Sequence, residues 1–348
     1  MRFCLRSALF LILGGLASCC AFSASRPAQE PTDYASHFNR GQELLQQMRI
    51  HEATAEFREA TRLNPEYLPA QQALAISYAA TENSVLAWKQ VRLLRQSRVD
   101  LPKEFLQELR KSLSEVEAVK QMEDLEKKLA AAQKAVVEHP NNPGLLAALG
   151  TALDKMGDYP AAQHAADQAL LLEPKQPDAH FLLGSMLGGE PYTSEQAIPH
   201  LKLYLQNVSR TPETAKEVAQ AYNMLASVYG RTGQEAKSLA TNEEGLKSAP
   251  DDDMMLNNAA WSYAAAQDPS LHDPQKALAY ARKAVTISKG ENASILDTLA
   301  EALYANSLFD EAVAAEKKAL ALEPKCEICW DQLKKFQAAQ QRAQQPKP

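Results

Sequence analysis

The sequence LLAALGTALDKMGDYPAAQHAADQALLLEP, residues 145–174, decides the fold. It contains two apolar patterns of helical period, separated by a break at residues 157–159 and closed by Pro174. Small residues stand where two helices must approach each other closely: Gly150 in the first segment, and Ala162, Ala166 and Ala169 in the second. The stretch therefore predicts a pair of antiparallel helices packed against each other.

This unit recurs along the chain with a period of about 34 residues. Three pairs of equivalent residues lie one period apart: Pro140 and Pro174, Gly150 and Gly184, and Ala226 and Ala260. One helical hairpin cannot bury its apolar face alone, so hairpins of this kind stack into an array with a continuous core. We therefore expect an array rather than a single globular core.

The unit resembles a tetratricopeptide repeat. In that family a bulky residue, a Leu and a small residue mark the first helix, and Ala, an aromatic residue, Ala and a closing Pro mark the second. The first copy here has Gly41, Leu44, Ala53, Phe57, Ala60 and Pro65, and the last has Leu299, Ala300, Ala312, Ala319 and Pro324. The resemblance implies an all-α, right-handed superhelical solenoid of about eight stacked hairpins over residues 34–325.

Some copies depart from the pattern. Asn242 and Gly245 replace the second-helix aromatic residue and Ala of the sixth copy, and residues 267–274 form an insertion in the seventh. Residues 103–139 contain no Gly or Pro, so they form either one long helix or a degenerate hairpin that turns at residues 121–124. We expect the hairpin, because Ala132 and Ala135 then occupy second-helix positions; a coiled-coil dimer is a third interpretation.

Both ends of the chain carry separate signals. Residues 1–24 read as an export signal, with Arg2 and Arg6 before a short apolar core at residues 8–16. Residues 16–19, Leu-Ala-Ser-Cys, resemble a bacterial lipobox, which implies that Cys19 carries a lipid; the alternatives are cleavage after residue 23 and an uncleaved anchor. We expect a flexible tether at residues 25–33, a polar-faced capping helix at residues 326–343 and a disordered tail at residues 344–348. The expected location is the periplasm or, by lipid anchoring, the cell envelope.

Composition excludes several classes of protein. Hydrophobic residues make up 45% of the chain and charged residues 23%, which suits a folded domain, and alternating Val, Ile and Thr patterns are almost absent. The net charge is -6, and removal of the leader with its two Arg residues makes the chain more acidic. Nucleic acid is therefore not an expected main partner, since phosphate binding needs a basic surface.

Catalytic signatures are scarce. The sequence has no Gly-rich phosphate loop, no Gly-x-Ser-x-Gly elbow and no His-Glu-x-x-His pair. The pattern that could carry chemistry is Cys326-Glu327-Ile328-Cys329, which we expect to be a structural disulfide or inert pair, with redox activity or metal binding as alternatives. We therefore expect no catalytic residue, cofactor, metal or small-molecule substrate, and the chain is not predicted to be an enzyme.

The resemblance also implies a binding site. In the family, the first helices line a concave groove that holds a peptide or a partner's helix. The register of this chain places eight residues inward: Phe38, Gln42, Phe181, Asn223, Asn257, Trp261, Asp297 and Glu301. Phe181 and Trp261 are the expected aromatic anchors, and Asn223 and Asn257 the expected contacts to a peptide backbone. The alternative for Trp261 is burial under the insertion at residues 267–274.

These observations favour a non-catalytic scaffold that binds other proteins in the bacterial cell envelope. One alternative is a chaperone-like assembly factor that holds extended segments of exported proteins. Another is a thiol redox factor that uses Cys326 and Cys329. A membrane contact is expected only through the N-terminal lipid.

Overall fold

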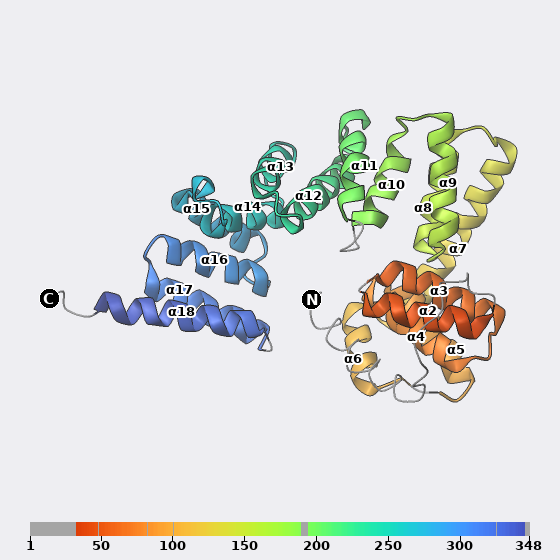
Figure 1. Ribbon diagram of the computed structural model, residues 1–348, viewed down its shortest axis with the longest axis horizontal. Coiled ribbons are helices and arrows are strands. Elements are labelled where there is room, and N and C mark those ends of the chain that lie inside the picture. Colours follow the sequence, from red (N-terminus) through yellow and green to blue (C-terminus); the bar gives the residue numbers. More distant parts are fainter. Residues whose placement is uncertain are drawn as a thin grey trace, which may run out of the picture. The chain divides into compact units, whose positions relative to one another are not determined.

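The computed structural model describes residues 33–47, 49–81, 83–99, 101–188, 194–324 and 326–344, and their regular secondary structure is helical throughout (Figure 1). The prediction of an all-α fold is confirmed. The chain forms two compact units, Met1–Ser194 and Glu195–Pro348, here called the N-terminal and C-terminal units. The expected export signal and Cys19 lie outside the described residues, as does the tail beyond residue 344.

The N-terminal unit consists of nine described α-helices. Their bounds are α2 Tyr34–Gln46, α3 Ile50–Leu63, α4 Leu68–Ala80, α5 Ser84–Gln96, α6 Lys103–Ser112, α7 Glu115–Glu138, α8 Pro143–Lys155, α9 Tyr159–Leu172 and α10 Pro177–Gly188. Helices α2 and α3, α4 and α5, and α8 and α9 pack as antiparallel pairs.

The hairpin of α8 and α9 shows why the repeat sequence folds as it does. The Asn142 side chain accepts a hydrogen bond from the backbone N–H of Leu145 and so caps α8. Gly157 has a φ of 72°, a conformation that favours glycine, and it ends the first helix. A Cβ at Gly150 would lie 3.0 Å from the carbonyl oxygen of Ala162 and 2.8 Å from Cδ2 of Leu182, so glycine permits the close packing of these helices.

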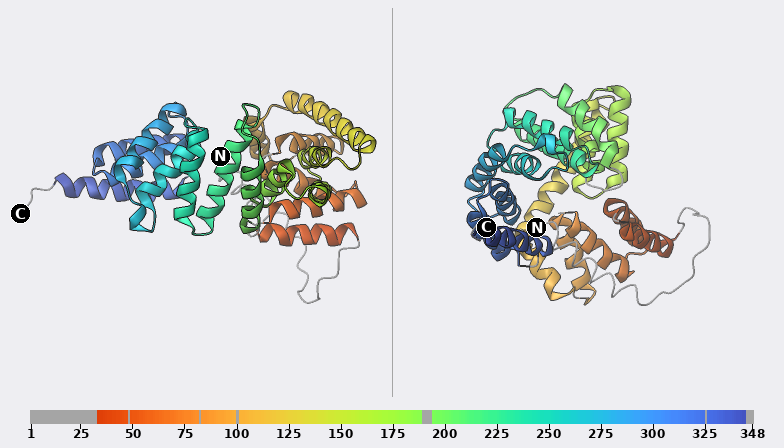
Figure 2. Two further views of the ribbon diagram at one scale, coloured as in Figure 1. Left: turned by 90° about the horizontal axis from the view of Figure 1, so that it is seen from above. Right: turned by 60° about the vertical axis from the view of Figure 1, so that its left-hand side comes forward.

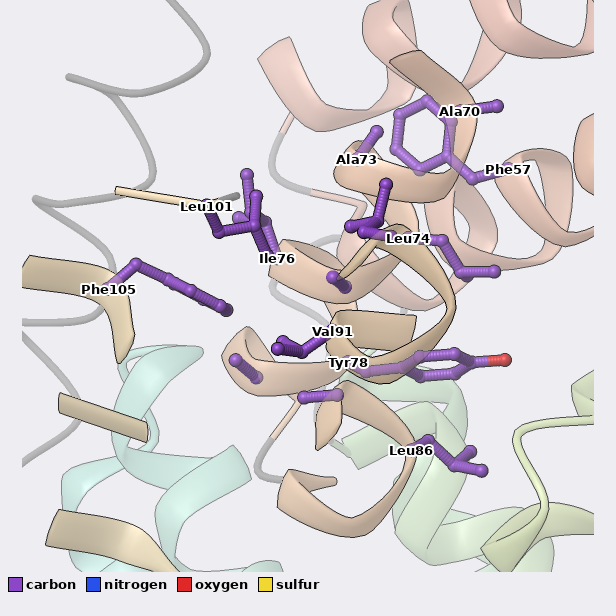
Figure 3. Close-up of a cluster of buried hydrophobic side chains, with 14 of the residues drawn as sticks. Phe57, Ala70, Ala73, Leu74, Ile76, Tyr78, Leu86, Val91, Leu101 and Phe105 are labelled. Atoms are coloured by element: carbon purple, nitrogen blue, oxygen red, sulfur yellow. The ribbon is translucent and has the colours of Figure 1, made fainter. Parts of the chain in front are cut away.

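The largest core cluster of the N-terminal unit joins the first two hairpins to α6 (Figure 3). Phe57, Leu74, Ile76 and Phe105 contribute to it, and Trp88 is only 1% exposed. The indole N–H of Trp88 donates a 2.8 Å hydrogen bond to the carbonyl oxygen of Leu113. This residue is therefore structural, and it fixes the segment that follows α6.

Residues 103–139 differ from the expected hairpin. Helix α6 ends at Ser112, and α7 runs without interruption from Glu115 to Glu138, so the predicted turn at residues 121–124 is wrong, and so is a single helix through the whole segment. Ser114 caps α7 by accepting the N–H of Glu117. The boundary between α6 and α7 is therefore marked by a serine cap and not by a Gly or Pro.

The turn between α8 and α9 docks on the first two hairpins. Arg58 on α3 forms a 2.8 Å ion pair with Asp158 and donates to the carbonyl oxygen of Gly157 at 2.9 Å. The Asn83 amide donates to the carbonyl oxygen of Lys155 at 3.1 Å. In a simple solenoid each repeat contacts only its neighbours. The N-terminal unit therefore departs from that arrangement, because its fourth hairpin also contacts the first.

The C-terminal unit continues the repeat, and its helices from α12 to α18 pack in chain order (Figure 1, Figure 2). Their bounds are α11 Ser194–Asn207, α12 Ala215–Arg231, α13 Glu235–Ser248, α14 Asp253–Ala265, α15 Pro274–Ile287, α16 Ala293–Ala305, α17 Phe309–Leu322 and α18 Glu327–Gln344. The insertion contains a short 3-10 helix, η2 Pro269–Leu271. Within the described residues, no helix is both long and apolar enough to cross a membrane.

The unusual sixth repeat has a packing explanation. A Cβ on Gly245 would lie 2.5 Å from Sδ of Met255 and 2.9 Å from Cβ of Tyr222. Glycine at this position lets α13 approach both α12 and α14. At the end of the array, Leu333 and Phe336 of α18 pack with Ala300 and Val313, so α18 covers the last hairpin.

Candidate functional site

Five of the residues that the sequence predicted for a binding groove lie on successive first helices of the C-terminal unit. Asn223 belongs to α12, Asn257 and Trp261 to α14, and Asp297 and Glu301 to α16. Helices α14 and α16 pack directly on each other. The face that these first helices share is called here the first-helix face.

Trp261 is the exposed aromatic residue of this face. It is 39% exposed, and Met254, two turns earlier on the same side of α14, is 44% exposed. The insertion packs on a different residue, because the N–H of Asp273 donates to the carbonyl oxygen of Tyr263, which is buried. Burial of Trp261 under the insertion is therefore not what the structure shows.

The two asparagines are largely committed to the protein itself. The side-chain amide of Asn223 donates to both carboxylate oxygens of Asp252 at 3.2 Å, and Asp252 caps α14 through the N–H of Met255. Asn257 is buried. Within the described part of the chain, Oδ1 of each asparagine is buried and accepts no hydrogen bond. Each oxygen is an acceptor that a partner's N–H can satisfy only after a local side-chain movement.

Glu301 has a structural partner. The residue is 5% exposed, and its carboxylate oxygens lie 2.6 Å and 2.9 Å from Nζ of Lys335 on α18. Nζ of Lys335 also lies 4.4 Å from the ring centre of Tyr304. The predicted role of Glu301 as an open groove residue is wrong, because the capping helix covers it and uses its charge.

Asp297 lies in a buried acid cluster with Glu316 of α17. A carboxyl oxygen of each residue and Sγ of Cys329 all lie within 4.8 Å of one another, and Glu316 is 0% exposed. Burial raises the pKa of both carboxyl groups above their usual range, and the negative charge of Asp297 raises the pKa of Glu316 further. The pair therefore holds a proton to higher pH than exposed carboxyl groups do.

Cys326 and Cys329 are joined by a disulfide at the start of α18. The backbone N–H of Cys329 donates to Sγ of Cys326 at 3.2 Å, so the first cysteine stands where a helix cap would stand. Cys329 is buried, and Cys326 is half-buried. The sequence identified this pair, but nothing in it indicated that two carboxyl groups lie beside the second sulfur.

The three remaining predicted residues belong to the N-terminal unit. Phe38 is buried, with ring centres 5.3 Å from Tyr67 and 5.7 Å from Phe57, so its predicted place in an open groove is wrong. Gln42 on α2 and Phe181 on α10 are half-buried. Aromatic residues of the neighbouring helices thus close over the position that Phe38 was expected to expose.

A pocket of about 460 Å³ in the N-terminal unit has no counterpart in the sequence prediction. Its walls include His51, Asp154 and Tyr159, together with Ser84 and Ser112, whose hydroxyl oxygens lie 2.5 Å apart. Burial lowers the pKa of His51 to about 4 and raises the pKa of Asp154 to about 6. These residues come from separate helices, so no sequence motif could reveal them.

Comparison with protein families identifies the repeat. The family described as tetratricopeptide repeat matches residues 34–67, 147–187 and 219–252. No curated protein matches the chain. The matched segments correspond to the first copy, to most of the stretch at residues 145–174, and to the sixth copy, which departs from the pattern at Asn242 and Gly245.

The chain is also similar to solved structures. One is YrrB, described as a TPR protein with an unusual peptide-binding site, at 15% identity and a TM-score of 0.49, covering 59% of this chain and 98% of that one. Another is PilW, described as a type IV pilus biogenesis factor, at 16% identity and a TM-score of 0.46. The match covers 62% of this chain and 92% of PilW. A third is MamA, at 21% identity and a TM-score of 0.42. The match covers 53% of this chain and 92% of MamA.

Three repeat matches and the paired helices point to one family. Tetratricopeptide repeat proteins are generally non-catalytic scaffolds for protein–protein interaction, so the fold suggests protein partners. The chain is a member of the tetratricopeptide repeat family.

Proposed function

We propose that the chain is a non-catalytic scaffold that binds an extended peptide or a helix of another protein on the first-helix face of its C-terminal unit. The observation that carries this proposal is the exposure of Trp261 and Met254 along one side of α14. The residues that alternate with them, such as Leu256 and Ala260, are buried. Exposure of large apolar side chains to water is unfavourable, and their burial against a partner is favourable.

The surroundings of Trp261 suit a binding anchor. Tryptophan is among the residues that contribute most to protein–protein binding when a partner covers them. Asn257 lies on the same first helix and Asn223 on α12, and each has a buried oxygen that accepts no hydrogen bond within the described residues. A peptide backbone or polar side chain of the partner supplies the missing N–H donors.

The proposed location is the bacterial cell envelope. Its support is the N-terminal sequence, with two Arg residues, a short apolar core and Cys19 in a lipobox-like context. The Cys326–Cys329 disulfide agrees with an oxidising compartment. Metabolic labelling with a palmitate analogue tests the lipid: Cys19→Ser should abolish labelling, Cys20→Ser should retain it, and labelling that survives Cys19→Ser contradicts the lipoprotein interpretation.

The binding proposal is tested by affinity capture with the tagged full chain from an envelope extract, followed by measurement of Kd with the partner recovered. Trp261→Ala should weaken binding by about 30-fold, since a binding hot spot contributes about 2 kcal/mol or more. Trp330→Ala is the matched control, because Trp330 is an exposed tryptophan of α18 outside the first-helix face. Equal binding by all three proteins would contradict the assignment of this face.

The same capture experiment separates the scaffold from an assembly factor. A scaffold should recover one or a few folded partners that are lost with Trp261→Ala. A chaperone-like factor should instead recover many unfolded chains, and the single substitution should leave that recovery unchanged. Absence of any enriched protein would contradict both.

A further inference from the structure

The disulfide and the buried acid cluster occupy one site formed by three helices. Cys326 and Cys329 begin α18, Asp297 projects from α16, and Glu316 from α17. Carboxyl oxygens of both acids lie within 4.8 Å of Sγ of Cys329. Both oxygens of Glu316 are buried, and the described residues offer them no donor if both acids are ionised. A proton shared between Asp297 and Glu316 satisfies this arrangement.

We propose that Cys326 and Cys329 form an exchange-active disulfide whose substrates are dithiol-bearing proteins, and that the carboxyl pair of Asp297 and Glu316 supplies the proton to Cys329. The proposal is independent of the binding face around Trp261.

The two sulfurs are not equivalent. Cys326 is half-buried, whereas Cys329 is 6% exposed, so an external thiolate reaches Cys326 first. The N–H of Cys329 points at Sγ of Cys326, and the positive end of α18 favours negative charge there. Cys329 is then the leaving group, and it departs toward the side where Glu316 and Asp297 hold a proton.

The exchange takes place in two thiol–disulfide steps. A substrate thiolate forms a bond to Sγ of Cys326, the Cys326–Cys329 bond breaks, and Cys329 leaves with the electron pair and takes the proton of the carboxyl pair. The second substrate thiol, as thiolate, attacks the substrate sulfur of the mixed disulfide and releases Cys326. The substrate dithiol is oxidised to a disulfide and both cysteines are reduced to thiols. The two protons of the substrate thiols pass through solvent, and one restores the carboxyl proton given to Cys329 while the other protonates Cys326.

The charges around the site favour retention of that proton. From α16, Glu301 adds a second negative charge near the pair, and it raises the pKa of both Asp297 and Glu316. From α18, Lys335 acts in the opposite direction on Asp297, but it is bound to Glu301 at 2.6 Å. The charge of Lys335 is thus divided between Glu301 and Asp297.

The test measures the rate at which dithiothreitol reduces the disulfide of the full chain between pH 5 and pH 9. Reduction is followed by alkylation of free thiols and mass spectrometry of the peptide that contains Cys326 and Cys329. The ionisation of dithiothreitol changes both rates by the same factor. The ratio of the wild-type rate to the Glu316→Gln rate is therefore independent of that ionisation. The ratio should be about 10 or more at acidic to neutral pH, in line with general-acid catalysis, and should fall toward 1 as the pair loses its proton.

Glu311→Gln is the matched control, because Glu311 is an exposed glutamate of the same helix, α17. The disulfide of this variant should be reduced at the wild-type rate over the whole pH range. A wild-type to Glu316→Gln ratio that stays at 1, or that is raised but independent of pH, would overturn the proposal, because a merely structural effect does not follow the carboxyl titration.

A second measurement needs no variant and keeps the proposal testable if Glu316→Gln fails to fold. The carboxyl carbon resonances of Glu316 and Asp297 are titrated in the oxidised and in the reduced protein. Reduction should shift the midpoint of the pair by at least about one pH unit, a tenfold change in proton affinity, since a thiol replaces the disulfide beside it. Identical titrations in the two states would overturn the proposal.

Discussion

Glu301 and Lys335 occupy equivalent positions on α16 and α18, one repeat apart, and their charged groups meet at 2.6 Å. Lys335→Met should leave a buried carboxylate without its partner, so the C-terminal unit should lose about 2 kcal/mol of stability. The figure is below that for a fully buried pair, because the Lys335 side chain is 44% exposed.

The measurement for Lys335→Met is amide hydrogen exchange along α18, which should accelerate by about 30-fold where exchange follows opening of the unit. Lys334→Met is the control, because the pair of Lys334 with Asp331 is exposed on both sides. Equal exchange in the two variants would show that the pair does not hold α18.

Gly245→Ala should destabilise the C-terminal unit by about 1–3 kcal/mol, because its new methyl group would overlap Met255 and Tyr222. Gly230→Ala is the matched comparison within the preceding helix, since the nearest atom to its Cβ, Oγ of Ser238, lies at 3.6 Å. That change should be neutral or stabilise the unit by up to about 1 kcal/mol. Urea unfolding of both variants measures the two changes in stability. Equal unfolding midpoints would contradict the predicted overlap at Gly245.

The stability of the C-terminal unit should fall as pH rises above the usual glutamate range. Folding raises the pKa of Glu316, so the folded state binds this proton more tightly than the unfolded state does. The resulting stability is fully present below the unfolded pKa and is lost as pH rises through the folded one. Unfolding by urea at pH 5, 7 and 9 measures how the free energy of unfolding changes with pH. Glu316→Gln should weaken this pH dependence, and an unchanged pH dependence would assign the effect to other groups.

Arg58→Met should loosen the α8–α9 turn in the N-terminal unit. The substitution removes the ion pair with Asp158 and the hydrogen bond to Gly157, for an expected loss of about 1–2 kcal/mol. Arg58 also holds the pKa of Asp158 below its usual range, so this contribution should disappear as pH falls through that lowered value. Hydrogen exchange in the turn gives the readout. Arg62→Met, which removes an exposed pair with Glu59, should leave the turn unchanged.

The sequence predicted the hairpins well because their determinants are local. Gly150, Ala162 and Pro174 act within one repeat, and the structure places each at the helix contact or helix end that its chemistry requires. The break before α7 was missed because Ser114 ends one helix and caps the next without Gly or Pro. Local residue chemistry thus predicts a repeat, whereas an inconspicuous cap can still move a boundary.

The candidate site was less predictable because exposure depends on distant segments. Trp261 and Glu301 occupy comparable first-helix positions, yet Trp261 is exposed and Glu301 is covered by Lys335 of the capping helix. Phe38 is likewise covered by Tyr67. The proximity of Glu316 to Cys329 arises from the packing of α16, α17 and α18, which a repeat register does not contain.

The bond between Arg58 and the α8–α9 turn has a mechanical consequence. It ties together parts of the chain that lie far apart in sequence, so the hairpins between them form a closed loop rather than an open row. Under a pulling force, such a loop should bear load as one block and release its length in a single step when the tie breaks. The C-terminal unit, whose helices pack in chain order, should instead lengthen gradually, one hairpin after another.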